Sequence, residues 1–125
     1  MKVTAEKNEQ VGNMIFASVY PHYVSRLERN GRTIEELNQV IKWFAGIDQA
    51  ALQTLLDEKA TFKTFFEKAS INPNAHLIKG VVCGYRIEEI ADEFEVYKQC
   101  RRLDKLIDEL ARGRKMERIM RKEKK

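Results

Sequence analysis

The stretch Thr33-Ile-Glu-Glu-Leu-Asn-Gln-Val-Ile-Lys-Trp-Phe-Ala-Gly46 decides the fold class. Thr33 and Glu36 have the spacing of a capping box, in which each side chain satisfies a backbone amide at the start of a helix. The apolar residues that follow recur every three or four positions and form one stripe: Ile34, Leu37, Val40, Ile41 and Phe44. Gly46 readily takes the left-handed conformation found at a helix end. The pattern predicts an amphipathic helix between Thr33 and Gly46.

The segments before this helix carry weaker helix signals. The apolar run from Met14 to Tyr23 is interrupted by Pro21, which has no amide hydrogen and disfavours helical geometry in the residue before it. We expect an extended or short helical entry, then a helix from about Pro21 to Arg29 that the proline opens. Residues 1–12 are polar and aperiodic, and they are predicted to form a flexible leader outside the core.

Three more helices are expected after Gly46. Asp48 and Thr61 are candidate N-caps of two short helices that bury leucines and phenylalanines. The longest helix runs from about Glu95 to Arg112, and its stripe consists of Val96, Leu103, Leu106, Ile107 and Leu110. Met116 and Ile119 fall on the opposite side of a straight continuation of this helix. A break or a redirected last turn is therefore predicted at Gly113.

The segment from Leu77 to Tyr85 lacks a helical pattern. Its glycines and branched residues favour a buried extended segment, with a short extended pair near Val81 and Phe16. Together these signals predict an all-α fold, namely a single-domain orthogonal bundle of five to six helices with one short extended segment. The expected boundaries are a flexible leader over 1–12, a helical domain over 13–113 and a basic amphipathic C-terminal tail over 114–125.

The composition limits the class of protein. A chain of 125 residues can close one hydrophobic core, and its 43% apolar and 34% charged residues are typical of a globular domain. Cys83 and Cys100 form no CxxC pair and no disulfide framework of the secreted kind. No run approaches the ~18 apolar residues of a membrane span, and the N-terminus lacks the apolar part of a signal peptide. We therefore expect a cytoplasmic protein without a membrane partner.

Positive charge is concentrated at the C-terminal end of the chain. Residues 112–125 carry eight basic and two acidic side chains, whereas residues 1–111 carry 15 basic and 17 acidic ones. The tail has the charge to bind phosphates and a small apolar stripe to dock on another surface. Its candidate contact residues are Arg114, Lys115, Met116, Arg118, Ile119 and Arg121, with Lys122 as a further phosphate contact. Because a charge run is usually a solvated face, nucleic acid ranks below a protein as the partner.

Several short motifs, in a fixed order between Met14 and Arg121, resemble those of one bacterial family. They are Phe16-Ala-Ser-Val-Tyr-Pro21, Gly31-Arg-Thr33, Trp43 with Gly46, Thr64-Phe-Phe66, Asn72-Pro-Asn74, Gly80-Val-Val-Cys-Gly84, Arg86-Ile-Glu-Glu-Ile90 and Leu103-Asp-Lys-Leu-Ile-Asp-Glu-Leu110. The chain resembles the bacterial domain-of-unknown-function family numbered two thousand two hundred. This resemblance implies a small helical prokaryotic protein and brings no known activity.

The chain departs from the family pattern in two places. Ala45-Gly46-Ile47 stands where the family is expected to have Thr-Gly-Tyr. A Pro-Leu-Met-Gln run leading to Arg-Tyr is expected within the stretch from Ala91 to Arg102, and it is not found there. The first departure puts any polar role of the residues around Gly46 in doubt.

Four residues are candidates for a polar or reactive site. Tyr20, His22 and Cys83 are of the types that serve proton transfer or nucleophilic attack. The alternatives are a turn histidine packed between aromatic residues for His22 and a small buried hydrophobe for Cys83. Arg86 is a candidate anion binder or a surface ion-pair partner. The acidic run 88–95 lacks the spacing of a calcium loop, and neither a metal nor a cofactor is expected.

These observations lead to three hypotheses about function. The first is a non-catalytic protein-interaction module that self-associates through its C-terminal segment, so that a homo-oligomer is the expected assembly. The alternative is a nucleic-acid accessory protein that uses the basic tail. The third is an enzyme of unknown reaction, which requires Tyr20, His22 and Cys83 to line one pocket. No identity of a ligand or partner follows from the sequence.

Overall fold

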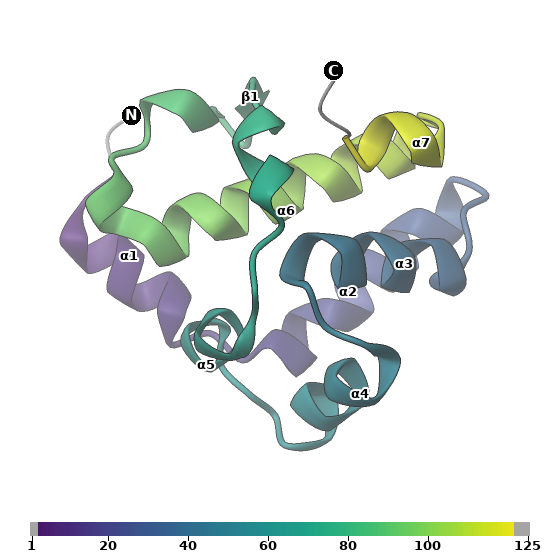
Figure 1. Ribbon diagram of the computed structural model, residues 1–125, viewed down its shortest axis with the longest axis horizontal. Coiled ribbons are helices and arrows are strands. Elements are labelled where there is room, and N and C mark those ends of the chain that lie inside the picture. Colours follow the sequence, from purple (N-terminus) through teal and green to yellow (C-terminus); the bar gives the residue numbers. More distant parts are fainter. Residues whose placement is uncertain (1–2, 122–125) are drawn as a thin grey trace.

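The computed structural model describes residues 3–121 and arranges them around one long central helix, α6 (Figure 1). Seven α-helices occur in these residues: α1 (Ala5–Gly12), α2 (Phe16–Arg29), α3 (Ile34–Ala45), α4 (Gln49–Asp57), α5 (Phe62–Lys68), α6 (Glu95–Ala111) and α7 (Met116–Ile119). A two-stranded hairpin, β1 (Val81–Val82) and β2 (Tyr85–Arg86), and 3₁₀ turns at Pro73–Leu77, Ile87–Glu89 and Asp92–Phe94 connect α5 to α6. The predicted mainly helical single domain is confirmed. Its described residues form seven α-helices and not five to six, because residues 5–12 and 116–119 also form helices.

The core lies where α2, α3 and α5 pack against the apolar stripe of α6. Leu103, Leu106 and Leu110 of α6 are fully buried, as are Phe16 of α2 and Phe65 of α5. The rings of Phe16 and Phe65 lie 4.6 Å apart between centroids, close to the lower limit for favourable aromatic pairs. Such contacts supply most of the stability of short helices, which are marginal on their own.

The helix ends in the first half of the chain follow the sequence signals. Thr33 and Glu36 form the predicted capping box, and the side chains of Asp48 and Thr61 each accept an amide hydrogen at the start of α4 and α5. Gly46 ends α3 in the left-handed conformation with φ of 63°. A Cβ atom placed on Gly46 would lie 2.2 Å from the carbonyl oxygen of Ser70, so no larger residue fits there.

Helix α2 begins five residues before the predicted start. It runs from Phe16 and holds Pro21 in its second turn, not at its opening. Its start is fixed by a bridge to the segment before α5, in which the Phe16 amide donates to the Ala60 carbonyl at 2.8 Å. The prediction failed because burial of Phe16 against α5 outweighs the single hydrogen bond that a proline inside a helix removes.

The extended segment pairs with its own continuation. Val81 lies opposite Arg86 and Val82 opposite Tyr85 in an antiparallel register, so the predicted pairing near Phe16 is wrong. The loop has two residues, Cys83 with φ of 52° and Gly84 with φ of 81°, as a type I′ turn requires. The turn matches the twist of the strands and lets them pair locally, which needs no distant partner.

The N-terminal segment differs from the predicted flexible leader. Residues 5–12 form α1, whose first turn is capped by Thr4, and α1 lies against the N-terminal end of α6. Gly12 is buried and Val11 packs on the core. The sequence shows no apolar period here because α1 touches the domain mainly through small and polar side chains. The domain boundary after residue 12 is therefore wrong.

The C-terminal segment also belongs to the domain. Gly113 has φ of 86° and breaks the helix there, as predicted. The chain then turns back into α7, and Ile119 is fully buried in the main core. The boundary at residue 113 is corrected, since residues 114–121 fold onto α3 and α6. Lys122 and the rest of the tail lie outside the described residues.

Candidate functional site

Two polar concavities meet on the face of α6 that lies beside the hairpin. We call the first the α2–α6 cleft, a space of about 550 Å³ lined by His22, Tyr23, Arg26, Val81, Val82, Cys83, Asp104, Ile107, Asp108 and Arg112. We call the second the end pocket, a space of about 410 Å³ lined by Val81, Lys105, Asp108, Glu109, Arg112 and Arg114. Both volumes fall in the usual range for ligand sites. They share three residues and thus form one continuous surface.

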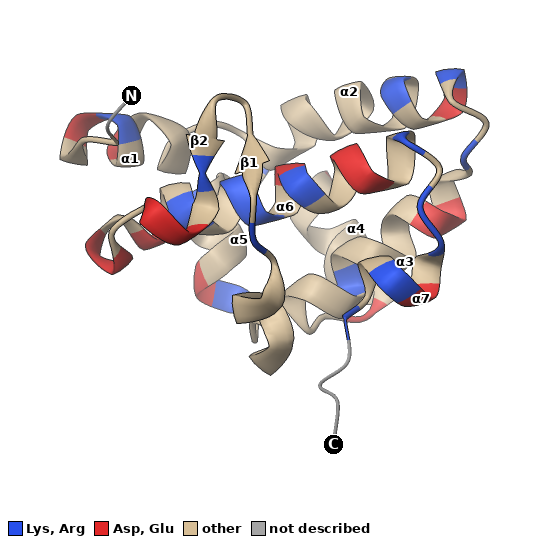
Figure 2. Cartoon of the chain, turned by 90° about the horizontal axis from the view of Figure 1, so that it is seen from above, with Lys and Arg blue, Asp and Glu red and all other residues tan. Residues whose placement is uncertain are grey.

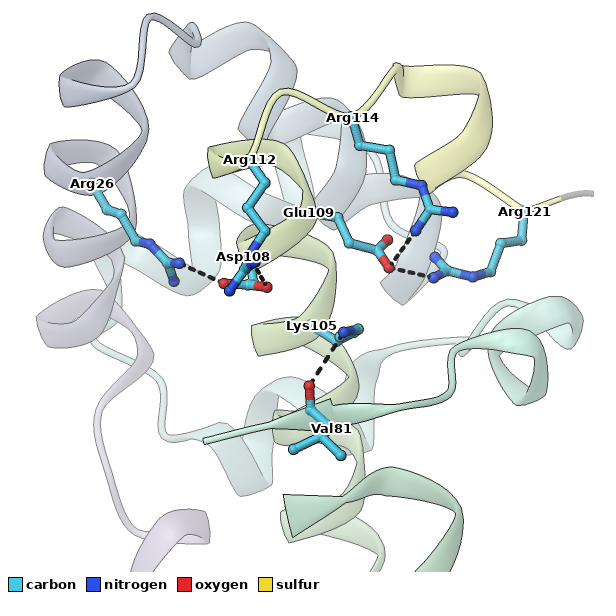
Figure 3. A network of polar contacts seen from close by, with 8 residues as sticks. All are labelled: Arg26, Val81, Lys105, Asp108, Glu109, Arg112, Arg114 and Arg121. Atoms are coloured by element: carbon cyan, nitrogen blue, oxygen red, sulfur yellow. Dashed lines mark hydrogen bonds and ion pairs between the residues drawn. The ribbon is translucent and has the colours of Figure 1, made fainter. Parts of the chain in front are cut away.

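Asp108 joins α2 to the end of α6. Arg26 donates to Asp108 Oδ1 at 2.6 Å, and Arg112 Nε lies 2.9 Å from Oδ2 (Figure 3). Partial burial works to raise the pKa of this carboxyl, but the hydrogen bonds and charges of the two arginines outweigh it, and the net pKa is lowered. Asp108 therefore stays ionised, and it orients both arginines at the border of the cleft and the pocket.

Glu109 holds the chain that follows α6. Its side chain is only 6% exposed, and its Oε2 atom accepts from Arg114 at 2.9 Å and from Arg121 at 2.7 Å (Figure 3). Two further bonds fix the same segment, since Arg32 donates to the Arg114 carbonyl and Asn74 donates to the Arg121 carbonyl. Glu109 thus acts as the buried anchor of residues 114–121.

The geometry at Gly113 explains why Arg114 reaches Glu109. The Arg114 amide donates to the Glu109 carbonyl and the Gly113 amide donates to the Leu110 carbonyl, both at 3.0 Å. This is the bond pattern of a Schellman motif, which brings the two side chains at its ends together. An apolar pair usually occupies these positions, whereas here an ion pair does. The local chain reversal therefore brings the side chains of Glu109 and Arg114 within ion-pair distance.

A small apolar cavity of about 260 Å³ lies on the other side of Tyr23, between α1, α2 and α6. Burial, followed by the charge of Asp104, raises the pKa of Tyr23 and of Cys100 far above their usual ranges. Burial also raises the pKa of Asp104, against the opposing charge of Arg101, to which it is bonded at 2.9 Å. The Cys100 thiol is accordingly protonated and packs as an apolar group.

The four candidate residues of the polar site are dispersed. His22 and Cys83 both line the α2–α6 cleft, and both are exposed. The Tyr20 hydroxyl instead donates to Asn38 of α3, and Arg86 lies in β2, 4.0 Å from Glu89. The interpretation of Cys83 as a small buried residue is wrong, because the two-residue turn places it at the tip of the hairpin. The enzyme hypothesis required Tyr20, His22 and Cys83 to line one pocket, and Tyr20 does not line the cleft that the other two share.

The candidate tail residues fall into two groups. Arg114 and Arg121 are bonded to Glu109, Ile119 is in the core, and Met116 packs against it. Lys115 and Arg118 are exposed. Two of the five residues proposed to contact phosphates thus already have a carboxylate partner, and the apolar stripe that was expected to dock elsewhere is largely used within the chain.

Sequence reasoning missed the residues that build this surface: Arg26, Asp104, Lys105, Asp108 and Glu109. Arg26 and Asp108 are 82 positions apart, and no local spacing connects them. Glu109 offered one signal, because it lies within the apolar half of the longest helix and precedes a predicted chain reversal by four residues. Buried acids in such positions usually have a basic partner.

Within residues 3–121, no group of three His, Cys, Asp or Glu side chains is arranged to hold a metal ion. The same part of the chain contains no helix with the length and apolar content needed to span a bilayer.

Comparison with known proteins identifies the same family that the sequence motifs resemble. The family model described as "Uncharacterized protein conserved in bacteria (DUF2200)" matches residues 10–121. The crystal structure of an uncharacterized protein, SP1917, has 36% sequence identity and a TM-score of 0.81 to this chain, covering 90% of it and 91% of that protein. No match was found among curated proteins.

Proposed function

Because the chain belongs to the uncharacterised bacterial family DUF2200, whose description assigns no activity, we propose from its surface that it is a non-catalytic protein-interaction module. The proposed contact surface is the hairpin face, which we define by Val81 and Cys83 of the hairpin and by Arg26, Lys105 and Arg112 around it. The observation that carries the proposal is the exposure of both hairpin residues directly beside the charged concavities of α6.

The hairpin face has the composition of a small protein interface. Val81 is 50% exposed, and it lines both the α2–α6 cleft and the end pocket. Arg26, Lys105 and Arg112 surround it. In protein interfaces with an apolar centre and a charged rim, the central residues supply most of the binding energy and the charged residues contribute to selectivity.

The conformation of Cys83 supports a role for its side chain. A residue other than glycine in the left-handed region costs roughly 1–2 kcal/mol, and Cys83 has φ of 52°. Asn or Gly at this position of a type I′ turn would have a much smaller penalty. Backbone strain of this kind tends to persist where the side chain is used. We therefore include the Cys83 thiol in the contact surface as a small apolar group.

This proposal places the partner on the hairpin face and not on the C-terminal segment. Self-association through residues 114–121 needs Ile119 and Met116 on the outside, but Ile119 fills the chain's own core. A second copy of the chain remains one of the protein partners that the experiment distinguishes.

Site-specific photo-crosslinking in bacterial cells tests the proposal. A photoreactive phenylalanine analogue replaces Val81 in one strain and Thr54 in another. Thr54 is an exposed residue of α4, and this helix lies on the opposite side of the molecule from the hairpin (Figure 1). We expect a discrete protein adduct from position 81 and none from position 54. An adduct of twice the monomer mass identifies a second copy of this chain. No adduct at position 81, or the same adducts from both positions, contradicts the proposal.

A further inference from the structure

Basic side chains gather around the end pocket in excess of the acidic ones. Figure 2 shows Lys and Arg on the hairpin, on α6 beneath it and on the segment that leads to α7. Three cations line the end pocket together with the carboxylates of Asp108 and Glu109, and they are Lys105, Arg112 and Arg114. Arg26 and Arg121 pair with the same two carboxylates from outside the pocket lining. The surplus is therefore one positive charge in the pocket lining, and three when Arg26 and Arg121 are included.

Internal neutralisation does not account for this surplus. The C-terminal end of a helix carries about half a negative elementary charge, which attracts cations to the end of α6. After the helix end and both carboxylates are counted, about half a positive charge remains in the pocket lining, and about 2.5 remain when Arg26 and Arg121 are included. A structure that needed cations only to stabilise Glu109 and the helix end would require fewer of them.

The basic groups still have donors to offer. Lys105 uses one hydrogen on the Val81 carbonyl, at 3.2 Å, and Arg112 uses only Nε on Asp108. Among residues 3–121, the two Nη groups of Arg112 make no hydrogen bond, and the side chain is 77% exposed. Arg114 likewise uses a single Nη group on Glu109. These donors line one concavity.

The position of these groups is held from both sides. The hairpin lies against Lys105, whose Nζ donates to the Val81 carbonyl at 3.2 Å and lies 3.6 Å from the place of a Cβ atom on Gly80. Asp108 orients Arg112 and Glu109 orients Arg114 (Figure 3). Preorganised donors bind an anion with less loss of side-chain entropy than mobile ones.

We propose that the end pocket binds the phosphate group of a small phosphorylated ligand through Lys105, Arg112 and Arg114. A phosphate monoester carries about −1.5 to −2 charge at neutral pH, and the positive surplus that includes Arg26 and Arg121 is large enough to balance it. Two guanidinium groups and one ammonium also suit the geometry of its oxygen atoms. This site does not depend on the proposed protein partner.

Titration of the isotope-labelled protein followed by NMR tests the site, with inorganic phosphate and glycerol phosphate as probes at constant ionic strength. We expect saturable shifts at Val81, Lys105 and residues 112–114. Equal affinity for both probes supports a site for the phosphate group alone, and tighter binding of glycerol phosphate supports a site that also contacts the organic part. Shifts that do not saturate, or that spread over all basic residues, overturn the proposal.

Three charge-matched variants sharpen the result. Lys105→Gln and Arg112→Gln should each weaken binding by about tenfold or more, because each removes a charged hydrogen-bond donor. Arg118→Gln removes the same charge from an exposed position outside the pocket and should change the affinity by less than about twofold. Equal losses in all three variants overturn the proposal. The proposal is also overturned if the protein binds a single-stranded oligonucleotide but neither phosphate probe, and if Arg118→Gln weakens that binding. This result would favour a polyanion site on the tail.

Discussion

The two ends of α6 are closed by the two ends of the described chain, with different chemistry (Figure 1). At the N-terminal end, Asn8 of α1 accepts the Tyr97 amide hydrogen at 2.9 Å, so that a distant side chain caps α6. At the C-terminal end, Glu109 and the buried Ile119 hold α7. The first closure combines the neutral Asn8 hydrogen bond with a contact of Lys7 to Tyr85 and apolar packing of Val11. The second combines two ion pairs on Glu109 with an apolar anchor.

The difference shows what each end of a helix lacks. The N-terminus of α6 offers free amide hydrogens, and the side chain of its N-cap residue, Phe94, accepts none of them. The Asn8 side chain supplies the missing cap oxygen. The C-terminal closure must instead reverse the chain and hold an eight-residue segment rich in arginine. A buried carboxylate satisfies two of those arginines at once. We therefore expect the C-terminal closure to contribute more to stability.

Removal of the Glu109 carboxylate should have the largest effect. Glu109→Ala leaves Arg114 and Arg121 without their partner, and loss of one member of a buried ion pair typically costs roughly 3–5 kcal/mol. Urea denaturation measures the free energy of unfolding. Glu117→Ala, an exposed change on α7 itself, is the matched control and should cost less than about 0.5 kcal/mol. Equal effects of the two variants would show that Glu109 is not the anchor.

Ile119→Ala tests the apolar half of the same closure. Deleting a fully buried isoleucine side chain should cost about 3 kcal/mol, since it leaves a cavity. Arg118→Ala is the control. In the double variant with Glu109→Ala, the loss should be clearly smaller than the sum of the single losses, because both residues hold one segment. Strict additivity would mean that the two contacts act independently.

Asn8→Ala should have a smaller effect, about 1 kcal/mol, by the usual cost of a lost helix cap. Asn8→Asp keeps the acceptor oxygen and adds a negative charge at a helix N-terminus, so it should retain or slightly increase stability. Thermal denaturation distinguishes the two variants. If both substitutions reduce stability equally, the contact of Asn8 with α6 is not a cap.

Asp108→Asn should have the smallest effect, about 0.5–1 kcal/mol at neutral pH, since both arginine partners are substantially exposed. The pKa of Asp108 is lowered from its usual 3.8, so its ion pairs stabilise the fold above that pH. The contribution is lost as the pH falls through the lowered pKa. Denaturation at pH 7 and at about pH 2 should therefore show a larger difference between variant and parent at pH 7 than at pH 2.

Local signals predicted the parts of the fold that local contacts determine. The capping box at Thr33, the caps at Asp48 and Thr61 and the break at Gly113 were all predicted, because each depends on residues a few positions apart. The early start of α2 was missed, since it depends on packing of Phe16 against α5. Helix α1 was missed because its contacts lie on α6, about 90 positions later.

The candidate site was predicted less well for the same reason. The sequence pointed to Cys83, and the structure leaves this residue in the surface we propose, though exposed and not buried. It gave no indication of Arg26 or Asp108, which meet only when α2 lies beside α6. The basic tail was recognised as a run of charge, but the partner of Arg114 and Arg121 is a single buried glutamate that no charge count reveals.

The closure of α6 by both chain ends has a consequence for the order of folding. Asn8 meets Tyr97 across 89 positions and Arg32 meets Arg114 across 82, so both contacts require large loops to close. During synthesis, α1 to α5 emerge before the helix that covers them. They can pack on one another, but the part of the core that α6 supplies is missing until residues 95–111 follow. We therefore expect folding in one late, cooperative step, at a rate limited by these distant contacts and not by helix formation.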